Sequence, residues 1–381
     1  MLKKENMLNN DWRLMKFEDC ILQLNTGLNP RSNFSLGKGN LKYITAKNLT
    51  KYGTVDFSKS DSIDEDAKRT INKRSDIQVG DILFSSRAPI GHCYLIKEEP
   101  NYYDIGESIF SIRVDKKVVI PEYLCLYLTS NFFVKLASKH TTGSIIQEIR
   151  IGDLMGTKVI VPPLKIQKDI ADCLYRIDRK IALNDMLNDN LLQQLMSLVY
   201  ENMMSLAYSN QIEGSFTTAD KLTEVITGRE DANFSSSNGK YKFFTCSNTP
   251  LKCDEYAFES SSILIAGNGD FNVKHYSGKF NAYQRTYVLT PAEEYYGLLY
   301  LSSLYRINSF KTSSAGSIVK FITKGDIENI PIFIPKDKKY LSYFNELVLT
   351  QEHILSENDE LTNLRDWLLP MLMNGQATIE N

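Results

Sequence analysis

The chain repeats part of its own sequence, and this repeat limits the possible folds more than any other feature. Residues 142–163 (TGSIIQEIRIGDLMGTKVIVPP) align without a gap with residues 315–336 (AGSIVKFITKGDIENIPIFIPK). Both segments carry a Gly-Ser-Ile motif, a Gly-Asp pair and a proline at the same places, at a constant offset of 173 residues. A gap-free match of this length predicts two copies of one structural unit.

The repeat continues upstream, but with gaps. Residues 42–45 (KYIT) resemble residues 242–245 (KFFT), and each segment has an asparagine three residues later. Two further matches are residues 25–27 (NTG) with 226–228 (ITG), and residues 81–84 (DILF) with 262–265 (SILI). The offset falls from about 200 to 173 residues along the copy, which indicates insertions within a shared scaffold. Variable loops on a common scaffold are typical of families whose members bind different ligands.

A stretch with helical periodicity follows each copy. Residues 166–204 contain no glycine or proline, and they show steps of four and three that are typical of a coiled-coil seam. The predicted seam positions are Ile170, Leu174, Ile177, Ile181, Asn184, Asn188, Leu191, Leu195 and Leu198. Residues 338–373 show the same steps, at Phe344, Leu347, Gln351, Ile354, Asn358, Leu361, Arg365, Leu368 and Leu372. We expect the two helices to pack on each other, with Asn184, Asn188 and Asn358 as polar layers that set the register. The alternative is that each helix packs only on its own domain.

Short β-rich runs and helical segments alternate before each of these long helices. The runs at residues 43–44, 81–84 and 109–114 resemble strands, and residues 121–139 resemble a helix. Each copy is therefore predicted to be a mixed α/β domain. The predicted order is a first domain (1–162), a first long helix (163–207), a second domain (208–335), a second long helix (336–375) and a tail (376–381).

Charge and composition constrain the partners only weakly. The net charge is −2, but the first 163 residues carry 23 Lys and Arg against 19 Asp and Glu, whereas residues 336–381 carry 4 against 8. This distribution permits a DNA-binding patch in the first copy without predicting one. No apolar run is long enough for a membrane span, the first residues lack the apolar core of a secretory signal, and the six cysteines are scattered. We expect a cytoplasmic chain with free thiols.

The sequence contains no pattern of residues that predicts catalysis. An adenine methyltransferase needs an Asn/Asp-Pro-Pro-aromatic motif, which residues 29–31 (NPR) and 248–250 (NTP) do not supply. Residues 115–117 and 337–339 (both DKK) match the acidic-x-Lys element of Mg²⁺ nucleases, but they lack convincing acidic partners. The four histidines have no Cys or His at metal-ligand spacing. We expect a chain that is not an enzyme and that holds neither a metal nor a cofactor.

Three segments carry a resemblance to a known family. The first is residues 79–91 (VGDILFSSRAPIG), a strand followed by a loop. The second runs from the Gly-Ser-Ile motif at Gly143 through paired prolines into residues 166–170 (IQKDI), and the third is residues 368–376 (LLPMLMNGQ). With these segments the chain resembles the DNA-specificity subunits of type I restriction-modification systems over almost its whole length. It departs from the family at Ile166, where a glutamate is usual, and in the lead-in to the second helix, which lacks the paired prolines.

The resemblance implies an α/β fold with two similar target-recognition domains, separated by two long antiparallel coiled-coil helices and related by a pseudo-twofold. It implies that the chain recognises a bipartite sequence in double-stranded DNA, one half per domain. It also implies partners: two methyltransferase subunits, which bind S-adenosylmethionine and methylate adenine, and motor-nuclease subunits that restrict the DNA. The alternatives are the specificity component of a fused methylase-nuclease of the type II kind, and a coiled-coil adaptor that does not bind DNA.

The residues expected to contact DNA are polar or cationic side chains near the repeated motifs. Arg and Lys bind phosphates or guanine edges, Asn and Gln can pair with adenine, and Ser and Thr bind the backbone. In the first domain the candidates are Lys42, Thr45, Lys47, Arg87, Thr142, Ser144 and Gln147. In the second domain they are Lys242, Asn248, Asn268, Lys274, Arg285, Ser314, Ser317 and Lys320. For Arg87 the alternative is a structural ion pair within its own loop.

Overall fold

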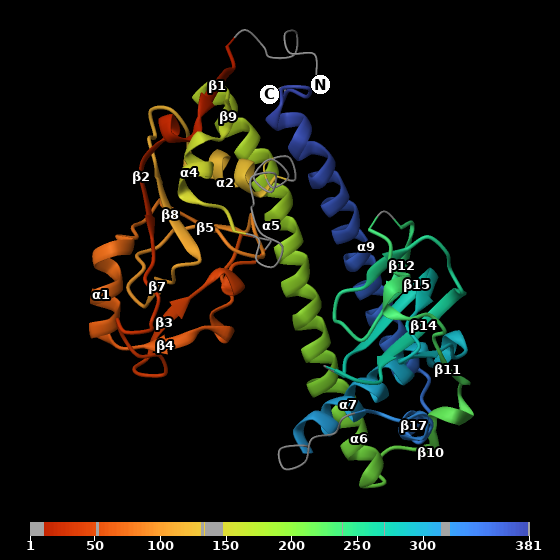
Figure 1. Cartoon of the computed structure of the whole chain (residues 1–381). Helices are drawn as coiled ribbons and strands as arrows, with labels where there is room; N and C mark the ends of the chain where they lie inside the picture. The colour runs from red at the N-terminus through yellow and green to blue at the C-terminus, as the bar shows by residue number, and fades with distance from the viewer. Residues whose placement is uncertain are drawn as a thin grey trace. The chain divides into compact units, whose positions relative to one another are not determined.

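The chain forms two compact units, each of which contains one α/β domain and a part of both long helices. The structure is a computed structural model, and it describes residues 11–50, 53–130, 133, 148–237, 239–269, 271–313 and 321–379. Unit 1 contains Met1–Ile181 and Glu360–Asn381, and unit 2 contains Ala182–Asp359. Both boundaries fall inside long helices (Figure 1). No helix in the described part of the chain has the length and apolar character that crossing a membrane requires.

The domain of unit 1 is built on small, mostly antiparallel sheets. Its described strands form a four-stranded sheet in the order β2-β8-β5-β6, a three-stranded sheet in the order β4-β3-β7, and an antiparallel pair of β1 with β9. The strands are β1 (Arg13–Lys16), β2 (Ile21–Thr26), β3 (Leu41–Ile44), β4 (Asp61–Ile63), β5 (Ile82–Ser85), β6 (Cys93–Leu95), β7 (Tyr103–Ile105), β8 (Ile109–Val114) and β9 (Lys158–Val161). The helices of this domain are α1 (Glu65–Ser75), α2 (Pro121–Thr129) and α4 (Ile151–Gly156). Because β5 lies inside its sheet, all four of its side chains are buried, which accounts for its apolar sequence.

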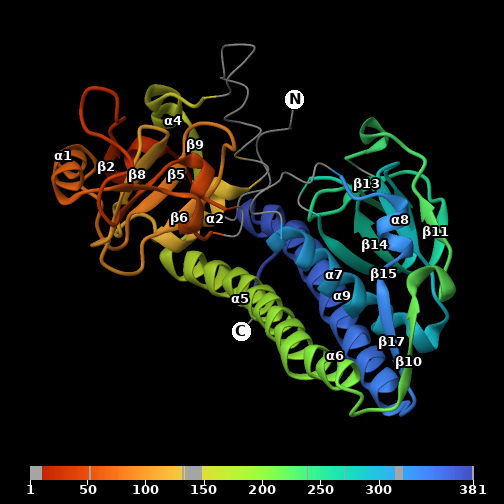
Figure 2. The same ribbon diagram turned by 90° about the horizontal axis from the view of Figure 1, so that it is seen from below.

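The domain of unit 2 has one larger sheet. Six strands form it in the order β11-β16-β14-β15-β12-β13, and β10 pairs with β17 beside it. The strands are β10 (Gly214–Thr218), β11 (Val225–Thr227), β12 (Tyr241–Phe244), β13 (Leu251–Cys253), β14 (Phe258–Ala266), β15 (Val273–Ala282), β16 (Thr286–Leu289) and β17 (Pro331–Pro335). The helices are α7 (Tyr296–Ser313) and α8 (Lys324–Glu328). Helix α7 packs on β14 and β15 (Figure 2). Its Leu298, Leu299 and Leu301 are buried in the core of this domain.

The two domains have the same strand order, and two differences, a split strand and an added helix, account for the drift in the repeat. In unit 2 the single long strand β15 pairs antiparallel with β14 and parallel with β12. In unit 1 two short strands take the place of this long one: β6 pairs with β5, and β7 pairs with β3. Residues 96–102 connect β6 to β7. Unit 1 also has α1 between β4 and β5, where unit 2 has only residues 254–257. The first copy is therefore longer in its middle and aligned at its end.

The long helices run antiparallel within each unit. The first consists of α5 (Leu164–Gln194), a π-helical turn (Leu195–Tyr200) and α6 (Glu201–Tyr208), and the second is α9 (Lys339–Met373). In unit 1, Arg365 Nη1 of α9 lies 3.1 Å from Asp178 Oδ1 of α5. In unit 2, Asn184 Nδ2 donates to Asn358 Oδ1 at 2.8 Å, and Gln351 Nε2 donates to the backbone oxygen of Asn188 at 3.2 Å. The predicted pairing of the helices and the polar layer of Asn184 with Asn358 are thus confirmed.

One predicted seam position is wrong. Leu198 is 69% exposed, although the seam spacing predicts that it faces the partner helix. The reason is the π-helical turn, which places more residues in one turn than an α-helix and so rotates the following side chains. Beyond Leu195 the buried residues of this helix are Tyr200, Met203, Met204 and Ala207.

Buried polar side chains attach each domain to its helices. In unit 1 the fully buried Gln167 of α5 accepts from the backbone N–H of Ile120 at 2.9 Å and donates to two backbone oxygens, those of Val118 and Pro162. In unit 2 Glu352 of α9 accepts from Tyr296 Oη at 2.8 Å and lies 3.1 Å from His275 Nδ1. These contacts couple the helix segments to the domains of their own units.

Candidate functional site

A cluster of loops lies at the ends of β3, β5 and β7 in unit 1. We call it the first loop cluster; it consists of Asn29, residues 45–47, 86–87, 106–108 and Glu148. The loops are tied together at Ser108. Its backbone oxygen accepts from Ser86 N at 3.0 Å, and its Oγ accepts from Ala46 N at 3.0 Å. Segments far apart in the sequence are therefore held in one place.

Unit 2 contains a second loop cluster with the same backbone hydrogen bonds. It consists of Glu230, residues 245–247, 267–268, 283–285 and Phe321. Gly267 N donates to Arg285 O at 2.8 Å, as Ser86 N donates to Ser108 O. Ile322 N donates to Gly267 O at 2.8 Å, as Ile149 N donates to Ser86 O at 2.8 Å. These hydrogen bonds align Ser86 with Gly267, Ser108 with Arg285, and Ile149 with Ile322. The residues next to them are thereby matched as well: Arg87 with Asn268, Glu107 with Gln284, and Glu148 with Phe321.

The glycine shared by both copies after a threonine has a steric explanation. A Cβ atom on Gly27 would lie 1.9 Å from the backbone oxygen of Ile105. A Cβ atom on Gly228 would lie 2.1 Å from the backbone oxygen of Ala282. Any side chain at either position would push β7 or β15 away from the loop that follows β2 or β11. The repeated glycine thus preserves the close approach that forms each loop cluster.

Arg87 is the centre of the first loop cluster. Its Nη1 donates to Glu107 Oε1 at 2.9 Å, and its Nε lies 3.3 Å from Glu148 Oε1, an ion-pair distance without hydrogen-bond alignment. Glu107 also accepts from Asn29 Nδ2 at 2.8 Å. This hydrogen bond and the Arg87 guanidinium lower the pKa of Glu107 against the effect of burial, so its carboxylate is ionised at neutral pH. The side chains of Arg87, Glu107 and Glu148 are 37%, 36% and 44% exposed, so all three remain accessible.

The other described candidates of the first domain lie at or near this cluster. Lys47 is exposed on the 3-10 turn Ala46–Asn48. Thr45 begins that turn, and its backbone N–H donates to Asn48 Oδ1 at 2.8 Å, so it shapes the loop. Lys42 lies on β3 between β4 and β7, one strand length away from the loops. Thr142, Ser144 and Gln147 lie outside the described residues.

Three candidates of the second domain lie at its loop cluster, and Lys242 does not. Asn248, Asn268 and Arg285 lie in or beside the second loop cluster, with Asn248 and Arg285 exposed. Lys242 instead donates to Asp359 Oδ2 of α9 at 2.6 Å, and its Nζ lies 4.9 Å from the ring centroid of Tyr276.

Lys274 supports the second loop cluster from β15. Its Nζ donates to the backbone oxygen of Thr245 at 3.2 Å and to Asn272 Oδ1 at 2.5 Å. Asn272 Nδ2 in turn donates to the backbone oxygen of Cys246 at 2.8 Å. Burial lowers the pKa of Lys274 to about 8. The remaining candidates Ser314, Ser317 and Lys320 lie outside the described residues.

The prediction of donors missed the carboxylates that surround Arg87. Neither carboxylate is shared by the two copies, because unit 2 has Gln284 in place of Glu107 and, within the gap-free repeat, Phe321 in place of Glu148. A search for residues that differ between the two aligned copies would have found Glu148 but not Glu107, because the alignment has gaps around Glu107. Only the three-dimensional match assigns it a partner.

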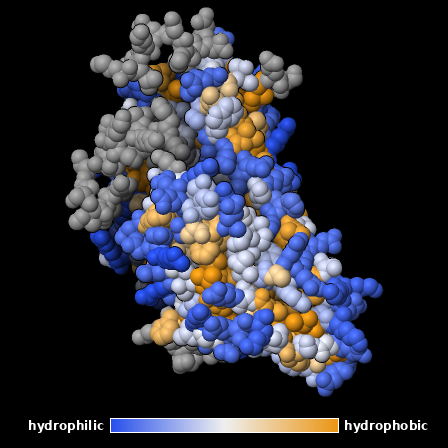
Figure 3. Space-filling view, turned by 90° about the vertical axis from the view of Figure 1, so that its right-hand side faces the viewer, coloured by the Kyte–Doolittle hydropathy of each residue, from blue (hydrophilic) through white to orange (hydrophobic). Residues whose placement is uncertain are grey.

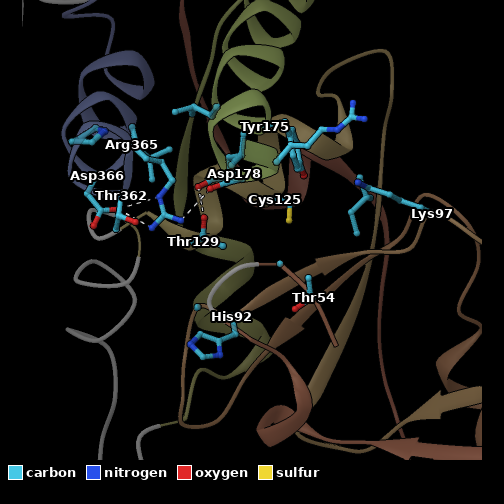
Figure 4. Close-up of a pocket in the computed structure, with 18 of the residues that line it drawn as sticks. Thr54, His92, Lys97, Cys125, Thr129, Tyr175, Asp178, Thr362, Arg365 and Asp366 are labelled. Atoms are coloured by element: carbon cyan, nitrogen blue, oxygen red, sulfur yellow. Dashed lines mark hydrogen bonds and ion pairs between the residues drawn. The ribbon is translucent and has the colours of Figure 1, made fainter. Parts of the chain in front are cut away.

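A separate pocket of about 690 Å³ lies in unit 1 between the domain and its helix segments (Figure 4). Asp178 and Arg365 meet at one side of it, and His92, Lys97 and Tyr175 also line it. None of the DNA-contact candidates that the structure describes lines this pocket. Among the described residues no group of three or more His, Cys, Asp and Glu side chains is placed to hold a metal ion.

Comparisons with known proteins agree with this architecture. The E. coli "Type I restriction enzyme EcoDI specificity subunit" is 34% identical over 167 residues, which are 42% of this chain and 38% of that protein. The "Type I restriction enzyme MjaIX specificity subunit" of Methanocaldococcus jannaschii is 24% identical over 417 aligned residues, covering 97% of this chain and 94% of that protein. The crystal structure of the type I restriction-modification S subunit from M. genitalium has the same fold, with a TM-score of 0.54 at 18% identity over 98% of each chain.

The family comparison covers most of the sequence. The family described as "Type I restriction modification DNA specificity domain" matches residues 9–193 and residues 220–363. The matched ranges include the first domain, the second domain except β10, and most of both long helices. The predicted α/β fold with two similar domains is confirmed. The chain therefore belongs to the type I restriction-modification DNA-specificity family, whose members are specificity components and not enzymes.

Proposed function

We propose that this chain recognises a bipartite DNA target, one half with each domain, and so directs adenine methylation and restriction by its partner subunits. The observation that carries the proposal is the pair of loop clusters. Their backbones are held by the same hydrogen bonds, but their side chains differ at the matched positions, with Arg87 in one and Asn268 in the other. A common scaffold with different side chains is what the recognition of two different half-sites requires.

The side chains of the two clusters suit contacts with DNA. Arginine pairs bidentately with the O6 and N7 atoms of guanine, and asparagine with the N6 and N7 atoms of adenine. We assign Arg87 and Asn268 to these base contacts. The exposed cations Lys47 and Arg285 lie in the same clusters, where they can bind phosphates and position each domain without contributing sequence preference.

The long helices supply a surface for protein partners. Leu183, Met186 and Leu187 on α5 are 52%, 62% and 47% exposed, and their spacing places them on one side of that helix in unit 2. Exposed apolar residues grouped in this way are typical of protein interfaces. Figure 3 shows hydrophobic areas among hydrophilic residues on one face of the molecule. We assign the helices to the binding of two methyltransferase subunits, which would hold S-adenosylmethionine, with motor-nuclease subunits joining for restriction.

Mapping of methylated adenines in cells tests this proposal. Cells that express the chain with its methyltransferase should methylate one bipartite motif, and cells without the chain should lose that methylation. Replacing residues 1–162 by the corresponding domain of a relative should change one half of the motif and leave the other intact. Methylation that is independent of the chain, or a change in both halves together, would contradict the proposal.

A further inference from the structure

The three charged side chains at the centre of the first loop cluster form a defined unit. Arg87 lies between Glu107 and Glu148, which come from loops 20 and 61 residues further along the chain. We call these three side chains the arginine clamp. Its guanidinium makes one hydrogen bond and one ion pair, and no bond to Nη2 is present among the described residues. Within the described part of the chain, the second N–H of Nη1 and both N–H groups of Nη2 have no partner, and these donors can pair with the two acceptors of a guanine edge.

The charge of the clamp distinguishes between the acceptors that DNA offers. A free arginine binds a phosphate strongly, because a guanidinium and an anionic oxygen pair form charge-assisted hydrogen bonds. Two carboxylates beside one guanidinium give these three side chains a formal net charge of −1. The Arg31 guanidinium also acts on Glu107, but the carboxylates next to Arg87 still weaken its attraction for a phosphate. The edge of a base pair is neutral, so it meets the remaining N–H donors without repulsion from the carboxylates.

We propose that Glu107 and Glu148 are specificity-determining positioning residues, which suppress phosphate binding by Arg87 and reserve its free donors for a guanine edge in one half-site. This inference rests on the proposed function of the chain. It assigns roles to two carboxylates that make no attractive contact with the DNA backbone and that lower affinity for DNA in general. The two carboxylates increase the difference in affinity between the target and other DNA, and specificity depends on this difference.

The second domain provides an internal control. At the matched positions it has Asn268, Gln284 and Phe321, none of which carries a charge. A neutral amide has no strong attraction to phosphate, so no carboxylate is needed beside it. Changes to the clamp should consequently affect one half-site only.

The test measures the binding of the full-length chain, assembled with its methyltransferase, to two duplexes over a range of salt concentrations. One duplex contains the target mapped by methylation, and the other is a non-target duplex of the same length. Glu107→Gln should lower the ratio of target to non-target affinity by about tenfold, the loss of one base-pair discrimination. It should also strengthen non-target binding, with a salt dependence that is steeper by about 0.9, because the released Arg87 binds one more phosphate. Glu148→Gln should act in the same direction.

Control variants separate this role from a structural one. Glu99→Gln removes the same charge from an exposed position in the same domain, outside the clamp, and should change neither the ratio nor the salt dependence beyond a few per cent. Arg87→Gln should lose the discrimination without strengthening non-target binding. In Glu107→Gln and in Glu148→Gln, the methylated motif should accept other bases at one base pair of one half-site. The other half-site should be unchanged.

Two results would overturn the inference. If the ratio of target to non-target affinity were unchanged in both glutamate variants, the carboxylates would not determine specificity. Weaker binding to both duplexes by the same factor would show that they only stabilise the loops, and the midpoint of unfolding followed by tryptophan fluorescence would fall with it. A wild-type complex without any target preference would instead contradict the proposed function itself.

Discussion

Single residues differ between the two copies even where the backbone is the same. Asp104 in the first copy and Asn281 in the second occupy the same buried position, and they show how such a difference affects stability. Asp104 on β7 and Asn281 on β15 occupy matched places beside β3 and β12. Each side-chain oxygen accepts from the next backbone N–H at 2.8 Å, that of Ile105 or Ala282. The asparagine does this without charge. Asp104 is fully buried, and burial raises its pKa to about 6, although hydrogen bonds such as the one from Ser75 oppose the rise.

The sign of this shift makes a prediction about pH. The folded state holds the Asp104 proton more tightly than the unfolded chain, where the pKa is about 3.9. The stability due to this proton is fully present below about pH 4, and it is lost as the pH rises through 6. An asparagine at this position cannot ionise. The stability of Asp104→Asn relative to the wild type should therefore be greater at pH 8 than at pH 5, by about 1.5 kcal/mol.

Urea unfolding at the two pH values measures this difference. Tryptophan fluorescence reports on unit 1, because Trp12 and Trp367 are the two tryptophans of the sequence and both belong to that unit. Asn281→Ala in unit 2 serves as a control, which should leave the pH dependence of the unit 1 transition as it is in the wild type. An Asp104→Asn variant with the same relative stability at both pH values would show that Asp104 does not titrate in this range.

At the scale of elements, the first long helix shows how one irregular turn changes which side chains are buried in the rest of the helix. An α-helix with seam steps of four and three would bury both Leu195 and Leu198. The π-helical turn Leu195–Tyr200 rotates the chain, so Leu195 is 1% exposed and Leu198 is 69% exposed. Tyr200 takes the buried place, and its Oη donates to Ser302 Oγ of α7 at 2.9 Å. The turn thus directs α6 toward the core of the second domain, where Met203 and Met204 are buried.

Two substitutions of the same chemistry test the position of this turn. Leu195→Ala removes a buried side chain and should lower the free energy of unfolding by about 2–5 kcal/mol. Leu198→Ala removes an exposed one and should change it by less than about 0.5 kcal/mol. Thermal unfolding followed by circular dichroism measures both. Equal losses for the two variants would mean that the helix continues in regular α-helical phase through this region.

At the scale of the whole molecule, the long helices connect the two copies, and their length offers a way to test the spacing of the DNA target. Seven residues preserve the phase of the helix seam and add about 10 Å at 1.5 Å per residue. Insertion of seven residues after Ile181 in α5 and after Asp359 in α9 places the added turns where the two units meet along the chain. Since DNA rises about 3.4 Å per base pair, the gap between the half-sites should grow by about three base pairs.

Methylation mapping of this variant gives the result directly. Both half-sites should stay the same while the gap lengthens, with reduced activity because DNA also rotates as it lengthens, by one turn in about 10 base pairs. Insertion of two residues into α5 alone is the control, since it separates Asn184 from Asn358 and should destabilise the chain without changing the gap. An active seven-residue variant with an unchanged gap would mean that the helices bind partners but do not set the spacing.

Much of the architecture was predictable because it depends on local patterns. The gap-free match of residues 142–163 with 315–336 indicates the two copies, and the structure gives them the same strand order. The long helices follow from periodicity alone, since side chains three and four apart share a face of any α-helix. Arg87 was also within reach of the sequence, because it lies two residues after an apolar strand in the family signature.

The tertiary structure decided which of these residues meet. Arg87, Glu107 and Glu148 are separated in the sequence, and only the bonds around Ser108 and Ser86 bring their loops together. Lys242 lies in a repeated motif, but its ammonium group binds Asp359 of α9, more than a hundred residues away. The phase of the first helix beyond Leu195 depends on the packing of Tyr200 against α7. Local patterns fix the elements because neighbouring residues share one backbone geometry, whereas contacts between elements depend on how distant surfaces fit, which no short segment contains.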